Sequence, residues 1–181
     1  MTDEYRSPTT GTVMRRVEDT PERLVFERRY PPNTGRGPQH VHDDFRHRFE
    51  CLEGEAIVDA GEERWVLRSG EVTEIAPGGA HSDPYNASRA DAVVRWTITP
   101  QTDFVRRFAR LWVQCLVRGR LDRQDEMSAL QIMVLLDEGN HRSHVAGPAL
   151  VVALQRLLLP AIAAFGRLRG LRADYSGGPG M

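Results

Sequence analysis

Cysteine is scarce in this sequence, and targeting signals are missing. Only Cys51 and Cys115 occur among 181 residues, and they show no C-x-x-C spacing. We therefore expect two reduced thiols in the core or in a pocket. The first twelve residues hold no apolar run, so no secretory signal is expected, and the chain is predicted to stay in the cytoplasm.

The chain also lacks an excess of charge of either sign. It has 24 basic and 25 acidic residues, which gives a formal net charge of -1. A nucleic-acid partner is not expected, because phosphate binding depends on clustered basic charge. The sequence contains no G-x-S-x-G elbow, P-loop or G-x-G-x-x-G turn, so the common nucleophile and nucleotide motifs are excluded.

The chain changes character near Pro100. Before it, segments of alternating polarity are separated by Gly, Pro and Asn turns, as is typical of a β-barrel or sandwich. The expected strands are residues 12–17, 23–30, 46–52, 55–60, 63–68, 72–76 and 92–99. After it, apolar residues recur at helical spacing, which predicts helices over residues 103–118, 125–138 and about 148–169. Pro160 is expected to kink or split the last helix.

These periods predict a β domain over residues 1–99 and a helical extension over residues 100–175. The helices are expected to pack on the barrel or at a dimer interface, and residues 176–181 to form a flexible tail. Residues 145–166 are about long enough to cross a bilayer, but Arg156 lies in their middle. We favour a buried or subunit-packing helix. A helix on a membrane surface, with arginines toward the headgroups, stays open but is not favoured. The arginines concerned are Arg156, Arg167, Arg169 and Arg172.

Four of the six histidines lie in two segments that one barrel would bring together. His40 and His42 are two residues apart, so on a strand both imidazoles point to the same face. His47 restarts the alternation and can point inward as a third ligand. The turn Pro77-Gly78-Gly79 places His81 at the start of another strand as a fourth. His141 and His144 lie in a polar loop between predicted helices, and we expect both to be solvated.

A cluster of neutral imidazoles suits Zn, Fe, Ni or Cu as a divalent ion, and does not suit Mg or Ca. The sequence therefore predicts one transition-metal ion bound by His40, His42, His47 and His81. Because neutral ligands leave the ion its full charge, the site should attract an anionic or enolisable oxygen ligand.

The two histidine segments resemble the two conserved motifs of the cupin superfamily. The first is H-x-H followed by a strand that ends at Gly54, and the second runs from Gly70 through Pro77, Gly78 and His81 to Asn86. The match covers about residues 20–99, and the whole chain looks like small bacterial single-barrel cupins with a helical C-terminal extension. The resemblance implies a mainly β fold with α, in which a jelly-roll β-barrel over about residues 11–99 is followed by the helical segment.

The chain departs from the cupin pattern at the glutamate. Counting seven residues back from Gly54 gives His47, so the usual three-His-one-Glu set becomes four His. The change resembles cupins with all-histidine sites, among them an aromatic polyketide cyclase, and it weakens a direct transfer of dioxygenase activity. Glu50 is not a replacement, because it faces away from His47.

Alternation suggests further inward residues around the metal. Arg28, Tyr30, Phe49 and Trp96 are the candidate substrate-pocket residues. Which face of the last strand points inward stays open at this point, so Trp96 and Arg95 are alternatives.

Two functions remain. The first is a small metalloenzyme of dioxygenase, isomerase or cyclase type, which acts on an aromatic or enolisable small molecule. The sequence assigns no catalytic residue, although His47 is a candidate base. The second is a non-catalytic module that binds or senses a small ligand or a metal. Apolar side chains on the helices also predict a homodimer.

Overall fold

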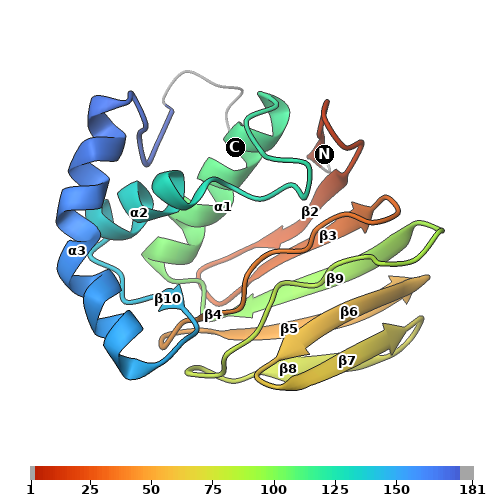
Figure 1. Cartoon of the computed structure of the whole chain (residues 1–181). Helices are drawn as coiled ribbons and strands as arrows, with labels where there is room; N and C mark the ends of the chain where they lie inside the picture. Colours follow the sequence, from red (N-terminus) through yellow and green to blue (C-terminus); the bar gives the residue numbers. More distant parts are fainter. Residues whose placement is uncertain (1–2, 176–181) are drawn as a thin grey trace.

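The computed structural model describes residues 3–175 and consists of two layers of strands with three helices beside them (Figure 1). The strands are β1 (Glu4–Arg6), β2 (Val13–Asp19), β3 (Leu24–Tyr30), β4 (His40–Val41), β5 (Arg46–Glu53), β6 (Glu55–Ala60), β7 (Glu63–Arg68), β8 (Val72–Ile75), β9 (Ala92–Thr99) and β10 (His144–Val145). The helices are α1 (Asp103–Val117), α2 (Ala129–Glu138) and α3 (Ala149–Leu168). The expected class, mainly β with a helical C-terminal part, is confirmed. The predicted flexible tail lies outside the described residues.

The larger layer is a six-stranded antiparallel sheet in the order β1-β2-β3-β9-β5-β8. Its inner face follows from the alternation of the strands. On β5, His47, Phe49 and Cys51 are buried, whereas the residues between them are partly exposed. On β9, Trp96 is buried and pairs with Phe49, so it points into the molecule. The open choice between Trp96 and Arg95 is thus resolved in favour of Trp96.

The smaller layer consists of two antiparallel pairs, of which only β6 with β7 is a hairpin. β4 pairs with β10, and β6 pairs with β7. Residues 81–85 lie between the two pairs, because His81 bridges to both His40 and Ala60 while Tyr85 bridges to Ile57.

No closed barrel is found among residues 3–175, so this detail of the prediction is not confirmed. Their strands form two layers that do not join into one continuous hydrogen-bonded cylinder. The reason is that closure requires continuous pairing along every strand. Here β4 and β10 have two residues each, and residues 81–86 pair only through isolated bridges. The remaining open side of the sandwich is where the helices pack.

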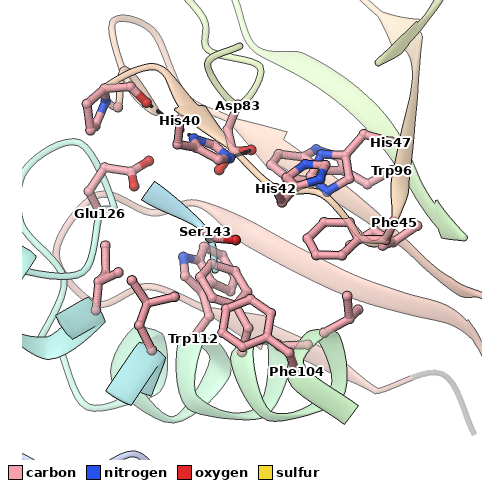
Figure 2. Close-up of a pocket in the computed structure, with 18 of the residues that line it drawn as sticks. His40, His42, Phe45, His47, Asp83, Trp96, Phe104, Trp112, Glu126 and Ser143 are labelled. Carbon is pink, nitrogen blue, oxygen red and sulfur yellow. Dashed lines mark hydrogen bonds and ion pairs between the residues drawn. The ribbon is translucent and has the colours of Figure 1, made fainter. Parts of the chain in front are cut away.

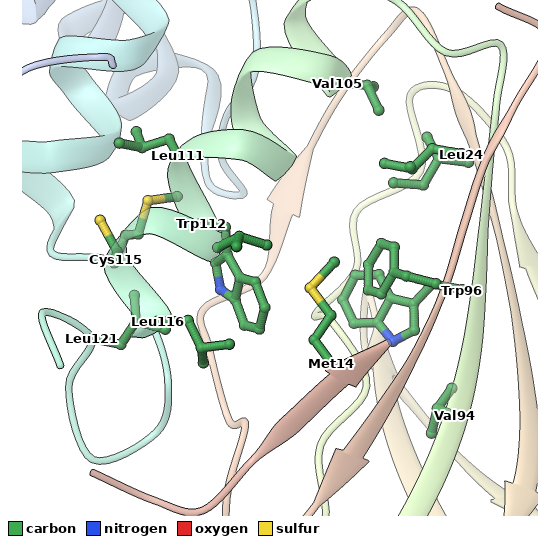
Figure 3. Packing of buried hydrophobic residues seen from close by; sticks show 14 of the residues in the cluster. Met14, Leu24, Val94, Trp96, Val105, Leu111, Trp112, Cys115, Leu116 and Leu121 are labelled. Carbon is green, nitrogen blue, oxygen red and sulfur yellow. The ribbon is translucent and has the colours of Figure 1, made fainter. Parts of the chain in front are cut away.

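Helix α1 connects the strand layers to the rest of the helical part. Val105 and Trp112 on its inner side share one buried cluster with Met14, Leu24 and Trp96 of the sheet (Figure 3). Burying a large aromatic ring of this kind is a major source of stabilisation in a core. The helical extension is therefore part of the main core and not an appendage attached through a loop.

The segment before α2 differs from its prediction. The helix expected from residue 125 begins at Ala129, where the Ser128 hydroxyl accepts a hydrogen bond from the Gln131 amide. Asp125 instead has a left-handed backbone with φ 59 and is fully buried. Its carboxylate accepts hydrogen bonds from Thr10 and Thr12, near the N-terminus of the described chain. These tertiary contacts outweigh the local helical pattern.

The last helix also differs from its prediction. α3 is continuous through Pro160, so the proline does not split it. It packs along α2, where Gly166 lies against Val134, but most of its length is exposed. Within the single chain α3 is therefore not a buried helix, and the alternative of a subunit-packing helix stays a prediction. By length and composition α3 would also be able to cross a membrane.

Candidate metal centre

The two histidine segments meet at one end of the sandwich. His40 and His81 face each other as an antiparallel pair, in which the amide of each donates to the carbonyl of the other at 2.8 and 3.0 Å. The turn after β8 is fixed in the same way, because the Gly78 amide donates to the His42 carbonyl at 2.8 Å. Gly78 has φ 82, a left-handed conformation that glycine adopts without strain. Backbone hydrogen bonds therefore hold the two segments together without any contribution from an ion.

The imidazole rings form a tight group. The ring centroid of His81 lies 4.6 Å from that of His40, 4.9 Å from that of His42 and 5.2 Å from that of His47. The His42 ring lies 4.6 Å from the His47 ring and 5.9 Å from the His40 ring. His81 is close to all three of the others. Rings at these separations are close enough to aim nitrogen atoms at a common centre.

The ligand atoms divide into two overlapping sets. His40, His42 and His81 offer nitrogen atoms that all lie within 4.8 Å of one another. His47, His81 and Asp83 form a second set by the same measure. His81 belongs to both. The four predicted ligands thus converge, and Asp83 joins them as a fifth candidate.

Several polar atoms in this group are buried without a hydrogen-bond partner among the described residues. They are both ring nitrogens of His42, Nδ1 of His47, Nε2 of His81 and Oδ1 of Asp83. Leaving a buried polar atom unpaired costs about 1–3 kcal/mol. One nitrogen from each of these three histidines and Oδ1 of Asp83 are explained if they serve as ligands, so the residues present fit a metal ion.

Burial also sets the protonation of the cluster. Desolvation by burial lowers the pKa of His42 to about 4, with a further contribution from His40, and it lowers the pKa of His81 to about 4. The pKa of His47 is lowered well below its ordinary value, again mainly by burial. These imidazoles are therefore neutral near pH 7, which is the form that binds a metal.

A cavity of about 150 Å³ adjoins the histidines. Figure 2 shows His40, His42 and His47 on the strand side, with Phe104 and Trp112 of α1 facing them. An apolar cavity of roughly this size holds one benzene ring. Further lining side chains are Met14, Phe26, Phe45, Trp96, Phe108 and Met133. The cavity thus combines a polar wall of candidate ligands with aromatic and aliphatic walls.

The predicted pocket residues fall into two groups. Trp96 lines the cavity, whereas Arg28, Tyr30 and Phe49 lie among the buried residues behind its wall. Arg28 is sandwiched between aromatic rings, with its guanidinium carbon 4.3 Å from the centre of the Tyr30 ring and 4.7 Å from that of Trp112. Glu50 pairs with Arg48 at 2.9 Å, away from the histidines, as expected for that residue.

Two carboxyl groups at the cavity were missed by sequence reasoning. Asp83 lies two residues after His81, and its Oδ1 is 3.9 Å from His40 Nε2. Period-two spacing from His81 was a signal that could have found it. Glu126 comes from the loop before α2, and burial together with the nearby Asp83 raises its pKa to about 8. No local pattern marks Glu126, because only tertiary packing brings it there.

The helical part also contacts the first histidine segment, residues 40–42, directly. Strand β10 pairs with β4, so His144 lies opposite Val41 and Val145 opposite His40. His141 stacks on Phe104 with ring centroids 3.5 Å apart, and its Nε2 lies 3.0 Å from Asp44. The expectation that His141 and His144 are solvated is therefore wrong: His141 is largely buried, and His144 lines the cavity. His141 lies in the loop before β10 and His144 begins β10, and the neighbours of both come from distant parts of the chain.

Comparisons with known proteins extend this description. No family model matches the chain, and no curated protein sequence matches it. Solved structures resemble it at low identity, as three examples show. A protein from Thermus thermophilus is 22% identical and has a TM-score of 0.44, with 55% of this chain and 83% of that chain covered. The sugar phosphate isomerase from a cupin superfamily of Silicibacter pomeroyi is 15% identical, with a TM-score of 0.47 over 54% of this chain and 71% of that one. A predicted oxalate decarboxylase from Thermotoga maritima is 17% identical, with a TM-score of 0.46 over 55% and 92%.

Proposed function

We propose that this chain, which has the cupin fold, binds one divalent transition-metal ion at the histidine cluster and acts on a small aromatic or enolisable molecule. The observation that supports this most is the convergence of His40, His42 and His81, whose ligand atoms lie within 4.8 Å of one another. His40 and His42 also line a cavity of one-ring size. His47 is the fourth histidine of the cluster. Together with His81 and Asp83 it forms the second set of ligand atoms.

The chemistry follows from the residues around the cavity. A bound divalent ion would act as a Lewis acid and polarise a substrate oxygen. The rings of Trp96, Phe104 and Trp112 would hold a flat substrate and exclude water from it. Glu126 and Asp83 supply carboxyl groups at the same cavity that can hydrogen-bond a second substrate oxygen. An oxygenation, an isomerisation or a ring closure is compatible with this set of groups.

Metal content of purified variants tests the first half of the proposal. We expect untagged wild-type protein to bind about one equivalent of Co²⁺ or Zn²⁺, and His42→Ala and His81→Ala to bind little or none. His144→Ala is the matched control, because His144 lines the same cavity while its Nδ1 contacts the Arg142 carbonyl at 3.1 Å. Full metal content in both cluster variants would refute the assignment.

Ligand binding tests the second half. Adding catechol or 2,4-pentanedione to the Co²⁺-loaded protein should change its visible absorption, because either molecule offers oxygen atoms on a flat, one-ring-sized frame. Loss of this change on replacing Phe104 by a charged residue would place the ligand in the cavity. An unchanged spectrum with every small oxygen ligand tried would count against a substrate site at the metal.

A non-catalytic ligand-binding module is the second candidate. The observation in its favour is that strand β10 both lines the cavity and pairs with β4, so an occupant touches both parts of the chain. Turnover separates the two candidates. Stoichiometric binding without product, under aerobic conditions and with each metal in turn, would favour the module.

A further inference from the structure

Helix α3 lies at the edge of the molecule (Figure 1), and its outer face carries exposed apolar side chains. Leu150, Leu157 and Leu168 are 80%, 76% and 87% exposed, and further large apolar side chains accompany them. These are Val151, Leu154, Leu158 and Phe165. Contiguous exposed apolar patches on a soluble protein mark interaction surfaces.

The spacing of these residues is that of a coiled-coil seam. Exposed apolar residues recur at alternating steps of four and three: Leu150, Leu154, Leu157, Ala161, Ala164 and Leu168. A second exposed row follows at steps of seven: Val151, Leu158 and Phe165. The opposite face of the helix carries Ala163 and Gly166, which are buried against the rest of the chain. Such a strict seven-residue pattern facing solvent is what one helix offers to a second.

The pattern is also symmetric about the middle of the helix. If a second α3 ran antiparallel and centred on residue 159, Leu150 would face Leu168 of the other copy. Leu154 would face Ala164, and Leu157 would face Ala161. At the four inner positions each leucine would thus face an alanine, and this combination of large and small side chains suits knobs-into-holes packing. The second row is symmetric about residue 158, one position from the first centre, so Val151 would lie near Phe165 and Leu158 near its own counterpart.

We propose that α3 pairs with α3 of a second copy of this chain in an antiparallel, two-fold symmetric dimer. A two-fold interface uses the same patch on both partners, and a self-complementary helix face provides it. Fully covering a large apolar side chain hides roughly 60–120 Å², so the large side chains of this face would bury on the order of 500 Å² per protomer. Stable interfaces bury roughly 600–1,000 Å² per partner. The polar residues around the apolar face would supply the remaining area.

The charges beside the seam favour a second copy over a lipid surface. Helices that lie on membranes carry lysines or arginines along the polar face. α3 contains only Arg156 and Arg167 as charged residues. Arg167 is already paired with Asp137 at 2.9 Å, and Glu138 lies 4.0 Å from it. Within its own length α3 therefore offers little net positive charge to anionic lipid.

Sedimentation of the full chain tests the dimer. We expect wild type to be dimeric at micromolar concentration and Leu157→Glu to be monomeric, because each glutamate would face Ala161 of the partner. Leu157 is 76% exposed, so this variant should keep the circular dichroism spectrum of wild type. Arg156→Glu is the matched control: it introduces the same side chain one residue away, off the seam, and should remain dimeric. A monomeric wild type, or a dimeric Leu157→Glu, would overturn the proposal.

Cross-linking tests the orientation. A mixture of Leu150→Cys and Leu168→Cys proteins should form disulfide-linked heterodimers on mild oxidation, whereas each variant alone should not, because like positions lie about 27 Å apart in the antiparallel pair. Links within each single variant would indicate a parallel pair and overturn the geometry. Flotation of monomeric wild type with vesicles of phosphatidylcholine and phosphatidylglycerol would overturn the dimer in favour of a lipid partner.

Discussion

His40 and His81 are joined by two backbone hydrogen bonds, and their ring centroids lie 4.6 Å apart. The backbone therefore sets the separation of two candidate ligands that are distant in sequence. A site whose ligands are held this way is preorganised, so an ion need not pay for ordering the chain. Removing one imidazole should then change ion affinity more than it changes the fold.

The two overlapping ligand sets make different predictions for single variants. We expect the ion to bind mainly to His40, His42 and His81, so His40→Ala and His81→Ala should each weaken affinity by more than roughly 100-fold, beyond the effect of an outer-shell change. Asp83→Asn should weaken it by only about tenfold, because Asp83 would then act on His40 from outside the ligand set. Competition with a Zn²⁺ indicator measures this. An Asp83→Asn effect as large as that of His81→Ala would place the ion in the second set.

Stability of the metal-free protein should depend on pH through the buried histidines. The pKa of His42 and of His81 is about 4 in the folded chain, below the value of about 6.5 of an unfolded histidine. Between these values the unfolded chain binds more protons, so stability is fully present above pH 6.5 and is lost as the pH falls toward 4. Thermal unfolding after chelator treatment should show a midpoint that falls over this window.

The control for the pH dependence is a His42→Gln, His81→Gln double variant. Glutamine does not titrate, so the unfolding midpoint of this variant should change less between about pH 6.5 and 4.5 than that of wild type. A wild-type midpoint that stays constant across the window would show that these imidazoles are not neutralised by burial.

The buried carboxylate of Asp125 should be important for stability. It accepts hydrogen bonds from Thr10 and Thr12, and Arg28 lies 3.7 Å from it with both side chains essentially inaccessible. Asp125→Asn keeps the shape and tolerates φ 59, but it leaves the Arg28 guanidinium without this counter-charge. We expect a loss of about 3 kcal/mol in the free energy of unfolding, as for a broken buried pair.

Denaturant unfolding measures this loss, and the same loop offers a control. Asp122→Asn removes a charge at an exposed position whose Oδ1 accepts from the Gln124 and Glu126 amides, and asparagine can still accept both. Its cost should stay below about 1 kcal/mol. Equal effects of the two variants would argue against a special role of the buried pair.

The contact between α2 and α3 should not tolerate a methyl group at residue 166. A Cβ built on Gly166 would lie 2.6 Å from Cγ2 of Val134, and a β-branched side chain cannot easily turn away. Overpacking costs about 1–3 kcal/mol, whereas alanine in place of glycine gains roughly 1 kcal/mol in a helix. We expect Gly166→Ala to be destabilising by about 1 kcal/mol. Gly147→Ala, where the nearest atom is 3.7 Å away, should cost less, and the reverse order would contradict the tight packing.

Much of this molecule was predictable from its sequence, because much of it depends on local pattern. The alternation around Phe49 and the spacing of His40 and His42 are period-two signals, and they located the strands and the shared direction of the two imidazoles. The predictions failed where contacts with distant residues determine the local conformation or the surroundings of a side chain. Asp125 leaves the predicted helix because it is held by Thr10 and Thr12. His141 is packed against Phe104, and Glu126 reaches the cavity only through tertiary packing.

The side chain of Gln155 lies between α3 and the metal-binding segment. Its Oε1 accepts from the Val145 amide at 3.1 Å, and its Nε2 donates to the Val145 carbonyl at 3.4 Å, while Val145 in turn pairs with His40. Helix α3 is thus hydrogen-bonded to the residue that lies opposite a candidate ligand in the β4–β10 pair. Thermodynamic reciprocity then fixes a relation between the two events: whatever factor ion loading adds to self-association, self-association adds to ion affinity.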